Sequence, residues 1–274
     1  MDIDTIRVVH ALKKQGRHKQ SLRLLTSKQS KSIIFSNNAF YHVDEKGIYH
    51  ILSGLLPTLK RNFWPDTNMT RIMKRPKKDK KETKNGMKKA KKGTKTGGGG
   101  RFFGSIQGSR VHHELEDFIL LDDKNFRKKH GSLHPWTKRI LAYVVCQMKW
   151  LPLQCEYKVG DVTKRVGTAI DMICVNPVNG HLVFLEFKTG YKLYFENSDG
   201  RMSKCLSFMP NSPLNWANIQ LTTAVIMLLR QNPTIKIEET SSFVIRIDDE
   251  NLDSYHIDNT FISAMNPRLI QAIA

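Results

Sequence analysis

Two apolar runs of the sequence contain charged residues of types and spacing that suit metal chemistry. The run 167–175 has a single carboxylate, Asp171, and the run 181–188 ends on Glu186 and Lys188. Because side chains alternate along a strand, Glu186 and Lys188 project from the same face. Charged groups at the end of a buried strand are unfavourable unless they are paired or hold a ligand. The three residues are therefore candidates for an active site.

The segment 176–180, Asn-Pro-Val-Asn-Gly, predicts a turn between these runs. If the strands pair through this turn, Asp171 lies beside Glu186. Two carboxylates in an apolar sheet repel each other, and a divalent cation is the usual remedy; oxygen ligands suit Mg²⁺ or Mn²⁺. The alternative is an ordinary cross-strand ion pair between Glu186 and Lys188, with Asp171 starting a turn. An E-x-K pattern alone occurs widely by chance.

Hydrophobic periodicity predicts the elements that must position these residues. A helix is expected over about 105–128 and a second from Pro135 to about 147. The remaining predictions are strands at 153–159, 168–175 and 181–188, a helix at 213–229, a strand at 242–247 and a helix at 259–273. The order α-α-β-β-β-α-β-α predicts an α/β fold, a mixed central sheet flanked by helices.

Helix geometry separates two neighbouring histidines. At about 100° per residue, His112 and Glu116 lie together at the edge of the apolar stripe, near the core, whereas His113 points toward solvent. A lone histidine at a core edge is more often structural than a ligand. Farther along, Gln220 lies in a helix that is apolar nearly all round, where an unsatisfied amide costs about 1–3 kcal/mol.

In chain order, these motifs resemble the RecB-like branch of the PD-(D/E)xK nuclease superfamily, which includes the mitochondrial genome maintenance exonucleases. The matching residues span about 104–248 and are Gly108, His112, Glu116, Glu156, Gly167, Asp171, Glu186, Lys188, Thr189 and Gln220. The chain departs from the pattern at three points. One extra residue precedes the aspartate, Ile170 replaces the usual proline, and Ala224 stands where a tyrosine follows the glutamine, which leaves no phenol for a stacking contact there.

The resemblance implies a restriction-endonuclease-like core and a divalent-metal-dependent deoxyribonuclease, most often an exonuclease that processes DNA ends in replication, repair or recombination. It implies one or two Mg²⁺ (or Mn²⁺) held by His112, Asp171, Glu186 and the carbonyl of Phe187. Glu116 would help to place the histidine or the cation, and Gln220 would lie at the rim. Lys188 would position or deprotonate the attacking water, a role open to a lysine whose pKa is depressed by burial.

The chain is strongly basic, which favours a polyanionic partner, nucleic acid before membrane. Its net charge is +19, and twelve Lys/Arg against two acidic residues between Lys74 and Lys95 account for +10, leaving +9 for the rest. The residues expected to follow DNA phosphates are Lys158, Lys164, Arg165, Lys192, Arg201 and Lys204. For any one of them, a solvated surface charge is the plainer interpretation.

Composition divides the chain into three parts. Residues 1–73 have helical stretches such as 6–12 and no catalytic constellation; they form either a subdomain packed on the main domain or an arm that binds a protein partner. Residues 74–100, rich in Lys and Gly, are predicted to be a disordered linker. Its basic run 74–81 suits a nuclear localisation signal or a solvated spacer equally. Residues 101–274 are the predicted nuclease domain.

Cysteine usage and hydropathy predict an intracellular protein. The four cysteines form no CxxC pair, which favours reduced thiols over a zinc or iron–sulfur site. No apolar run approaches the roughly 20 residues of a membrane span, and the first ten residues lack a secretory layout. The basic run 74–81 is compatible with the nucleus, and the mitochondrion or another DNA-containing compartment is an alternative. The rival functions are a structure-selective endonuclease, a non-catalytic nucleic-acid-binding protein on the nuclease fold, and an interaction protein.

Overall fold

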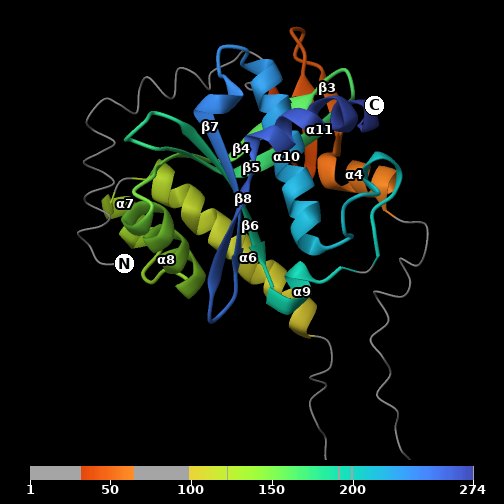
Figure 1. The fold of residues 1–274 in the computed structure, drawn as a ribbon. Helices are drawn as coiled ribbons and strands as arrows, with labels where there is room; N and C mark the ends of the chain where they lie inside the picture. Colours follow the sequence, from red (N-terminus) through yellow and green to blue (C-terminus); the bar gives the residue numbers. More distant parts are fainter. Residues whose placement is uncertain (1–31, 65–98, 122, 191, 199, 274) are drawn as a thin grey trace, which may run out of the picture.

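The structure of the protein, a computed structural model, describes residues 32–64, 99–121, 123–190, 192–198 and 200–273. The predicted helical stretch at 6–12 and the predicted linker up to residue 98 lie outside the described residues. The described chain forms an eight-stranded mixed sheet flanked by helices (Figure 1), so the predicted fold class is confirmed. Among the described helices, none is long and apolar enough to cross a membrane.

The sheet runs in the order β1-β2-β3-β5-β6-β7-β8, and β4 pairs with β5 outside this order. The β3–β5 and β6–β7 pairs are parallel and the other pairs are antiparallel. The strands are β1 (Ile33–Ser36), β2 (Ala39–Val43), β3 (Tyr49–Gly54), β4 (Leu151–Asp161), β5 (Val166–Val175), β6 (Leu182–Thr189), β7 (Thr240–Ile247) and β8 (Leu252–Ile257).

The helical segments are α4 (Leu55–Phe63), α6 (Gly99–Leu120), α7 (Asp123–Lys129), α8 (Pro135–Leu141), the π-helical η1 (Ala142–Gln147), α9 (Lys192–Glu196), the 3-10 turns η2 (Lys204–Leu206) and η3 (Ile237–Glu239), α10 (Pro213–Gln231) and α11 (Asn259–Ala272). The prediction of one helix over 105–128 is wrong, because α6 ends at Leu120 and a separate helix, α7, follows. This division lets the ring of Phe126 pack edge-on against Phe118, with centroids 5.7 Å apart.

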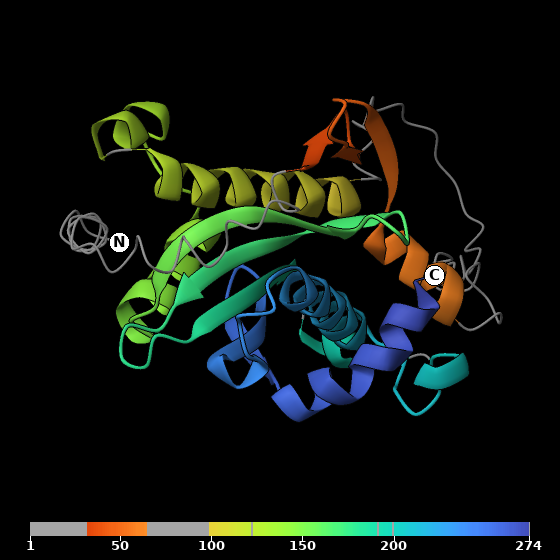
Figure 2. The same cartoon turned by 90° about the horizontal axis from the view of Figure 1, so that it is seen from above.

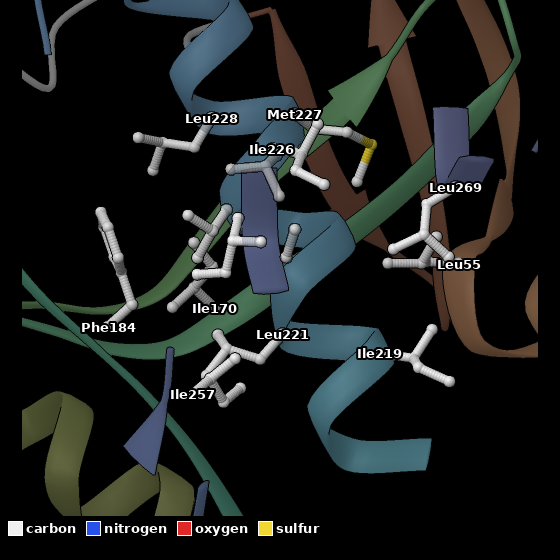
Figure 3. Close-up of a cluster of buried hydrophobic side chains, with 14 of the residues drawn as sticks. Leu55, Ile170, Phe184, Ile219, Leu221, Ile226, Met227, Leu228, Ile257 and Leu269 are labelled. Atoms are coloured by element: carbon white, nitrogen blue, oxygen red, sulfur yellow. The ribbon is translucent and has the colours of Figure 1, made fainter. Parts of the chain in front are cut away.

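Helices cover both faces of the sheet. In Figure 2, α6 lies above the strands, and α10 and α11 lie below them. Side chains of β6 point alternately to the two faces and so contribute to two hydrophobic cores. Leu185 packs in the core on the α6 side, whereas Phe184 packs in the core formed with α10 and α11. Figure 3 shows part of the cluster on this second face, to which the sheet contributes Ile170, α10 contributes Leu221 and α11 contributes Leu269. Burial between the sheet and α11 is the reason that α10 is apolar nearly all round.

The described part of the N-terminal region belongs to the same sheet. Strand β3 pairs in parallel with the start of β5 at Ser53↔Val166 and Gly54↔Gly167. The N-terminal strands approach so closely that a Cβ on Gly167 would lie 2.9 Å from the Cβ of Phe40, so only glycine fits there. Helix α4 then begins directly after β3 and buries Leu55 in the core shared with α10.

Strands β3 and β6 both pair with the same edge of β5, but at different positions along it. Strand β4 pairs along almost the whole of β5, so β3 and β6 must share the opposite edge. Strand β3 pairs only at Val166 and Gly167, and β6 only from Met172 to Val175. Residues 168–171 therefore face a fork in the sheet, and Asp171 lies at the point where β6 departs.

Candidate active site

Three carboxylates lie next to one another across β4, β5 and β6 at this fork. The register of the flanking pairs places Glu156 opposite Asp171 in the β4–β5 ladder. The β5–β6 ladder ends at Met172↔Leu185, and its continuation places Asp171 opposite Glu186. The sheet thus brings together the two carboxylates expected from the sequence and adds a third, Glu156, for which sequence reasoning gave a motif position but no role.

Glu156 has a left-handed backbone, with φ of +50°, which residues other than glycine seldom adopt. Ladder pairing is interrupted at this residue, and its carboxylate Oε1 lies 2.5 Å from Nδ1 of His112. Backbone strain of this kind tends to be kept at functional sites, where the surroundings hold it in place.

Helix α6 carries His112 to the fork. Its Nδ1 lies 2.5 Å from the Glu156 carboxylate and 3.8 Å from Oδ1 of Asp171. The potential ligand atoms of these three residues all lie within 4.8 Å of one another. Within the described ranges, no other three His, Cys, Asp or Glu residues are grouped so closely. His113 is 76% exposed, as the helix geometry predicted.

Asp171 is tied to β6 through the backbone. Its Oδ2 accepts a hydrogen bond of 2.6 Å from the N–H of Phe187, and the Phe187 ring packs edge-on toward the His112 imidazole. This bond fills the gap left where the β5–β6 ladder ends. It also places the backbone of Phe187, a predicted site residue, directly beside the carboxylates.

Glu186 and Lys188 form an ion pair on the α10 side of the sheet. The Lys188 Nζ donates to Oε1 of Glu186 at 2.5 Å and to Oε1 of Gln220 on α10 at 3.3 Å. The Glu186 carboxylate lies outside the group formed by His112, Glu156 and Asp171. The site therefore has two parts at the fork: His112 with Glu156 and Asp171 toward α6, and Lys188 with Glu186 and Gln220 toward α10.

Burial and the close approach of like charges shift the pKa values of the site residues. Burial and the nearby Asp171 raise the pKa of Glu186 to about 7, against the opposing pull of Lys188. Burial also raises the pKa of Asp171. For His112, burial disfavours the cation, but Asp171 and Glu156 outweigh it and raise the imidazole pKa to about 9. His112 and Lys188 are the positive charges that oppose the raised pKa values of Asp171 and Glu186.

The expectation of a depressed pKa for Lys188 is wrong. Burial does act in that direction, but the carboxylates of Glu186 and Asp171 outweigh it and raise the pKa above its ordinary 10.5. Lys188 is thus a cation here. Its position between Glu186 and Gln220 suits a group that orients an oxygen rather than one that removes a proton.

Glu116 is not among the grouped residues His112, Glu156 and Asp171. Its carboxylate is one-third exposed and lies 4.0 Å from His113, and Glu156 is the carboxylate that contacts His112. The neighbouring Glu114, which sequence reasoning missed, is the buried one. It accepts hydrogen bonds from Arg110, from the Thr137 hydroxyl and from the backbone of residue 134, and so fastens α6 to α8.

Arg246 anchors the chain directly after the E-x-K segment. It lies opposite Lys188 in the β6–β7 ladder and is fully buried. Its guanidinium donates to the Gly190 carbonyl at 2.7 Å and pairs with Asp248 and Asp253. This network fixes the end of β6, and with it the strand that carries Glu186 and Lys188.

The predicted phosphate-binding residues are spread over several elements. Lys164 and Arg165 lie at the β4–β5 turn, away from the carboxylates in the middle of those strands. The Lys192 ammonium lies 3.6 Å from Asp253, and Arg201 donates to a backbone carbonyl. The remaining two are Lys158, half-buried on β4, and Lys204, exposed in η2. The six residues therefore come from β4, the β4–β5 turn, α9 and the segment 201–204.

A pocket of about 500 Å³ opens beside the lysine end of the site. Lys188 and Gln220 line it, together with residues of α4, of α9 and the segment after it, and of the start of α10. The side chains of Lys188 and Gln220 are therefore reachable from this pocket.

Compared with known proteins, the chain matches no protein-family model and no curated protein sequence.

Proposed function

We propose that the protein is a divalent-metal-dependent nuclease that hydrolyses DNA phosphodiester bonds, and specifically an exonuclease that acts at DNA ends. The observation that carries the proposal is the arrangement at the fork. Glu156, Asp171 and Glu186 stand next to one another across three strands, with His112 on one side and Lys188 on the other. The order of these motifs along the chain adds the resemblance to RecB-like nucleases.

The residues fit a hard divalent cation. His112, Glu156 and Asp171 offer one nitrogen and two carboxylate oxygens within 4.8 Å, a donor set that suits Mg²⁺ or Mn²⁺. The raised pKa values of Asp171 and Glu186 show that negative charge at this place lacks sufficient compensation. When bound, such a cation supplies Lewis-acid activation of water and of the phosphodiester.

The protein's own groups would orient the substrate. Lys188, held by Glu186 and Gln220, presents an ammonium at the wall of the pocket, where it can bind a phosphate oxygen or the attacking water. Glu156 orients the His112 ring through its hydrogen bond, and the Phe187 N–H orients Asp171. A scaffold that only bound DNA would have no need of these buried charges.

The experiment is incubation of the protein with end-labelled linear DNA and closed circular DNA in Mg²⁺ or Mn²⁺. Loss of the linear form alone supports an exonuclease, and nicking of circles supports an endonuclease. Asp171→Asn and Lys188→Met should reduce the rate by about 10²–10⁴-fold, the usual contribution of such groups. The matched controls Glu250→Gln and Lys236→Met change exposed residues and should cut like wild type. If neither DNA is cut, or if the site variants cut as fast as the controls, the proposal is refuted.

A further inference from the structure

The pocket beside Lys188 is closed by α4, which belongs to the N-terminal region. Lys60 and Trp64, in and after this helix, line the pocket together with Tyr194 of α9 and Trp216 of α10. At about 500 Å³, it falls within the range of about 300–1,000 Å³ typical of small-ligand pockets. None of these four residues takes part in the carboxylate site.

Lys60 gives the pocket a positive charge. It is half-buried, and among the described residues no carboxylate forms an ion pair with its Nζ. Burial and the charge of Lys188 lower its pKa, so the two ammonium groups act on each other across the pocket. An anion between them would relieve this repulsion, and a phosphate is the anion that a nuclease substrate supplies.

The aromatic side chains give the pocket flat surfaces next to this charge. Tyr194 is 64% exposed and lines the pocket, so much of its side chain can contact a ligand. The Trp64 ring stacks on Trp216 with centroids 5.3 Å apart and an interplanar angle of 15°, and the Lys60 Nζ lies over Trp64. Aromatic rings beside a lysine are the combination with which proteins bind unpaired nucleotides, because every base has a face that can stack.

The pocket is held in shape without a ligand. The Ser203 N–H donates to the Phe63 carbonyl at 2.8 Å and its hydroxyl to the Trp64 carbonyl, which ties the end of α4 to the loop after α9. The Trp216 indole N–H donates to Asn211 at 2.7 Å. A prebuilt site of this kind loses little conformational entropy on binding.

We propose that this pocket binds one unpaired nucleotide of the substrate strand next to the scissile bond, with a phosphate at Lys60 and the base against Tyr194. The identity of the strand as a substrate rests on the proposed nuclease function. A base that is paired within a duplex cannot enter a pocket, so this site selects strands whose end is unpaired. The N-terminal region thereby supplies part of the substrate site.

The test is binding to the full-length protein in EDTA, where no cleavage occurs. Fluorescence anisotropy measures the affinity for a labelled single-stranded oligonucleotide of about twelve nucleotides and for its blunt duplex. Tyr194→Ala should raise the Kd for the single strand about 5- to 150-fold, the range of one lost stacking contact. Lys60→Met should weaken binding and reduce the slope of log affinity against log salt by about 0.7, the loss of one phosphate contact.

The controls match the test residues in chemistry. Lys236→Met and Tyr49→Ala change an exposed lysine and an exposed tyrosine outside the pocket, and both should bind like wild type. Tyr194→Phe and Lys60→Arg keep the ring and the charge, and should retain most of the affinity. They separate loss of a contact from loss of folding.

The outcomes separate the pocket from the nuclease proposal. If wild type cleaves DNA but Tyr194→Ala and Lys60→Met keep the wild-type Kd and salt slope, the pocket assignment is overturned and the nuclease stands. If the variants lose single-strand affinity while wild type cuts no DNA, the nuclease proposal fails and the pocket remains a nucleotide-binding site. Equal weakening of duplex and single-strand binding overturns the selection for unpaired ends.

Discussion

Replacing Glu186 with glutamine removes a buried negative charge while keeping the shape of the side chain. In the metal-free protein the pKa of this carboxyl is raised from its ordinary 4.5 to about 7. The folded state therefore disfavours the ionised form, whereas the unfolded chain does not. Each tenfold change in proton affinity corresponds to about 1.4 kcal/mol, so ionisation of Glu186 destabilises the fold at pH 7 by about 3 kcal/mol.

Glu186→Gln should accordingly stabilise the metal-free protein by about 3 kcal/mol. For a chain of this size that corresponds to a rise in Tm of about 6–12 °C. The assay is thermal and urea unfolding at pH 7, followed by circular dichroism, in EDTA and again in Mn²⁺. Mn²⁺ at a hundred times its Kd should stabilise wild type by about 2.7 kcal/mol, and the variant by less. A substitution that stabilises the protein while weakening metal binding is typical of a site built for function.

The opposite result would show that the ion pair between Glu186 and Lys188 is structural. In that case Glu186→Gln lowers the stability by more than about 1 kcal/mol in EDTA, and Mn²⁺ stabilises the variant and wild type equally. The matched control is Glu250→Gln, an exposed glutamate, whose stability should stay within about 0.5 kcal/mol of wild type.

Three further predictions concern stability in EDTA, measured by urea unfolding. Stability should fall as the pH rises from about 5 to about 9, for two reasons: the raised pKa of Glu186 makes its ionisation in the folded state unfavourable between pH 4.5 and about 7, and the stabilisation by charged His112, complete below pH 6.5, is lost as the pH rises through about 9. A stability that increases over this interval contradicts the reasoning. Glu114→Ala should cost about 3–5 kcal/mol because it leaves buried donors without an acceptor, whereas Glu250→Ala should change little. Arg246→Met should also cost about 3–5 kcal/mol, because it removes the buried guanidinium that pairs with Asp248 and Asp253. A loss below about 1 kcal/mol would show that this network is not structural.

The strands of the central hairpin could be predicted because one signal determines both their type and their register. The apolar runs that become β5 and β6 each contain only one or two charged positions, and the turn at 176–180 fixes their pairing. Once the register is fixed, Asp171 must stand opposite Glu186. The long helix α10 was predictable for a similar reason, since Ser212 caps it and Pro213 begins it.

The N-terminal strands and β8 could not be found in the same way. They lie toward the two edges of the sheet and bury few side chains: Tyr49 and Ile51 on β3 are each more than 60% exposed, and β8 has one fully buried residue, Ile257. Alternation of apolar and polar residues in a strand reflects burial of one face, and the pattern weakens when that face is partly exposed. These strands are therefore recognisable only from their pairing with neighbouring strands.

The role of Glu156 could not be predicted for a different reason. Period-two alternation assumes regular strand backbone, and Glu156 departs from it with a positive φ that brings its carboxylate to His112. On α6, helical periodicity alone does not predict that Glu114 is buried and Glu116 partly exposed, because the burial of Glu114 depends on its contact with α8. Local backbone irregularity and long-range packing are the two properties that periodicity does not contain.

The features that escaped periodicity share a physical property with those that were predicted. Glu156 has a strained backbone, and Asp171 and Glu186 hold raised pKa values, so each makes the metal-free fold less stable than a regular apolar sheet would be. They gather at the one place where β3 and β6 separate and the ladder already lacks a partner. Unfavourable groups scattered over a protein are unremarkable, but these are concentrated at a single gap beside a pocket with two lysines. This concentration supports the two proposals: a cation held by the donors at the fork, and a phosphate between Lys60 and Lys188.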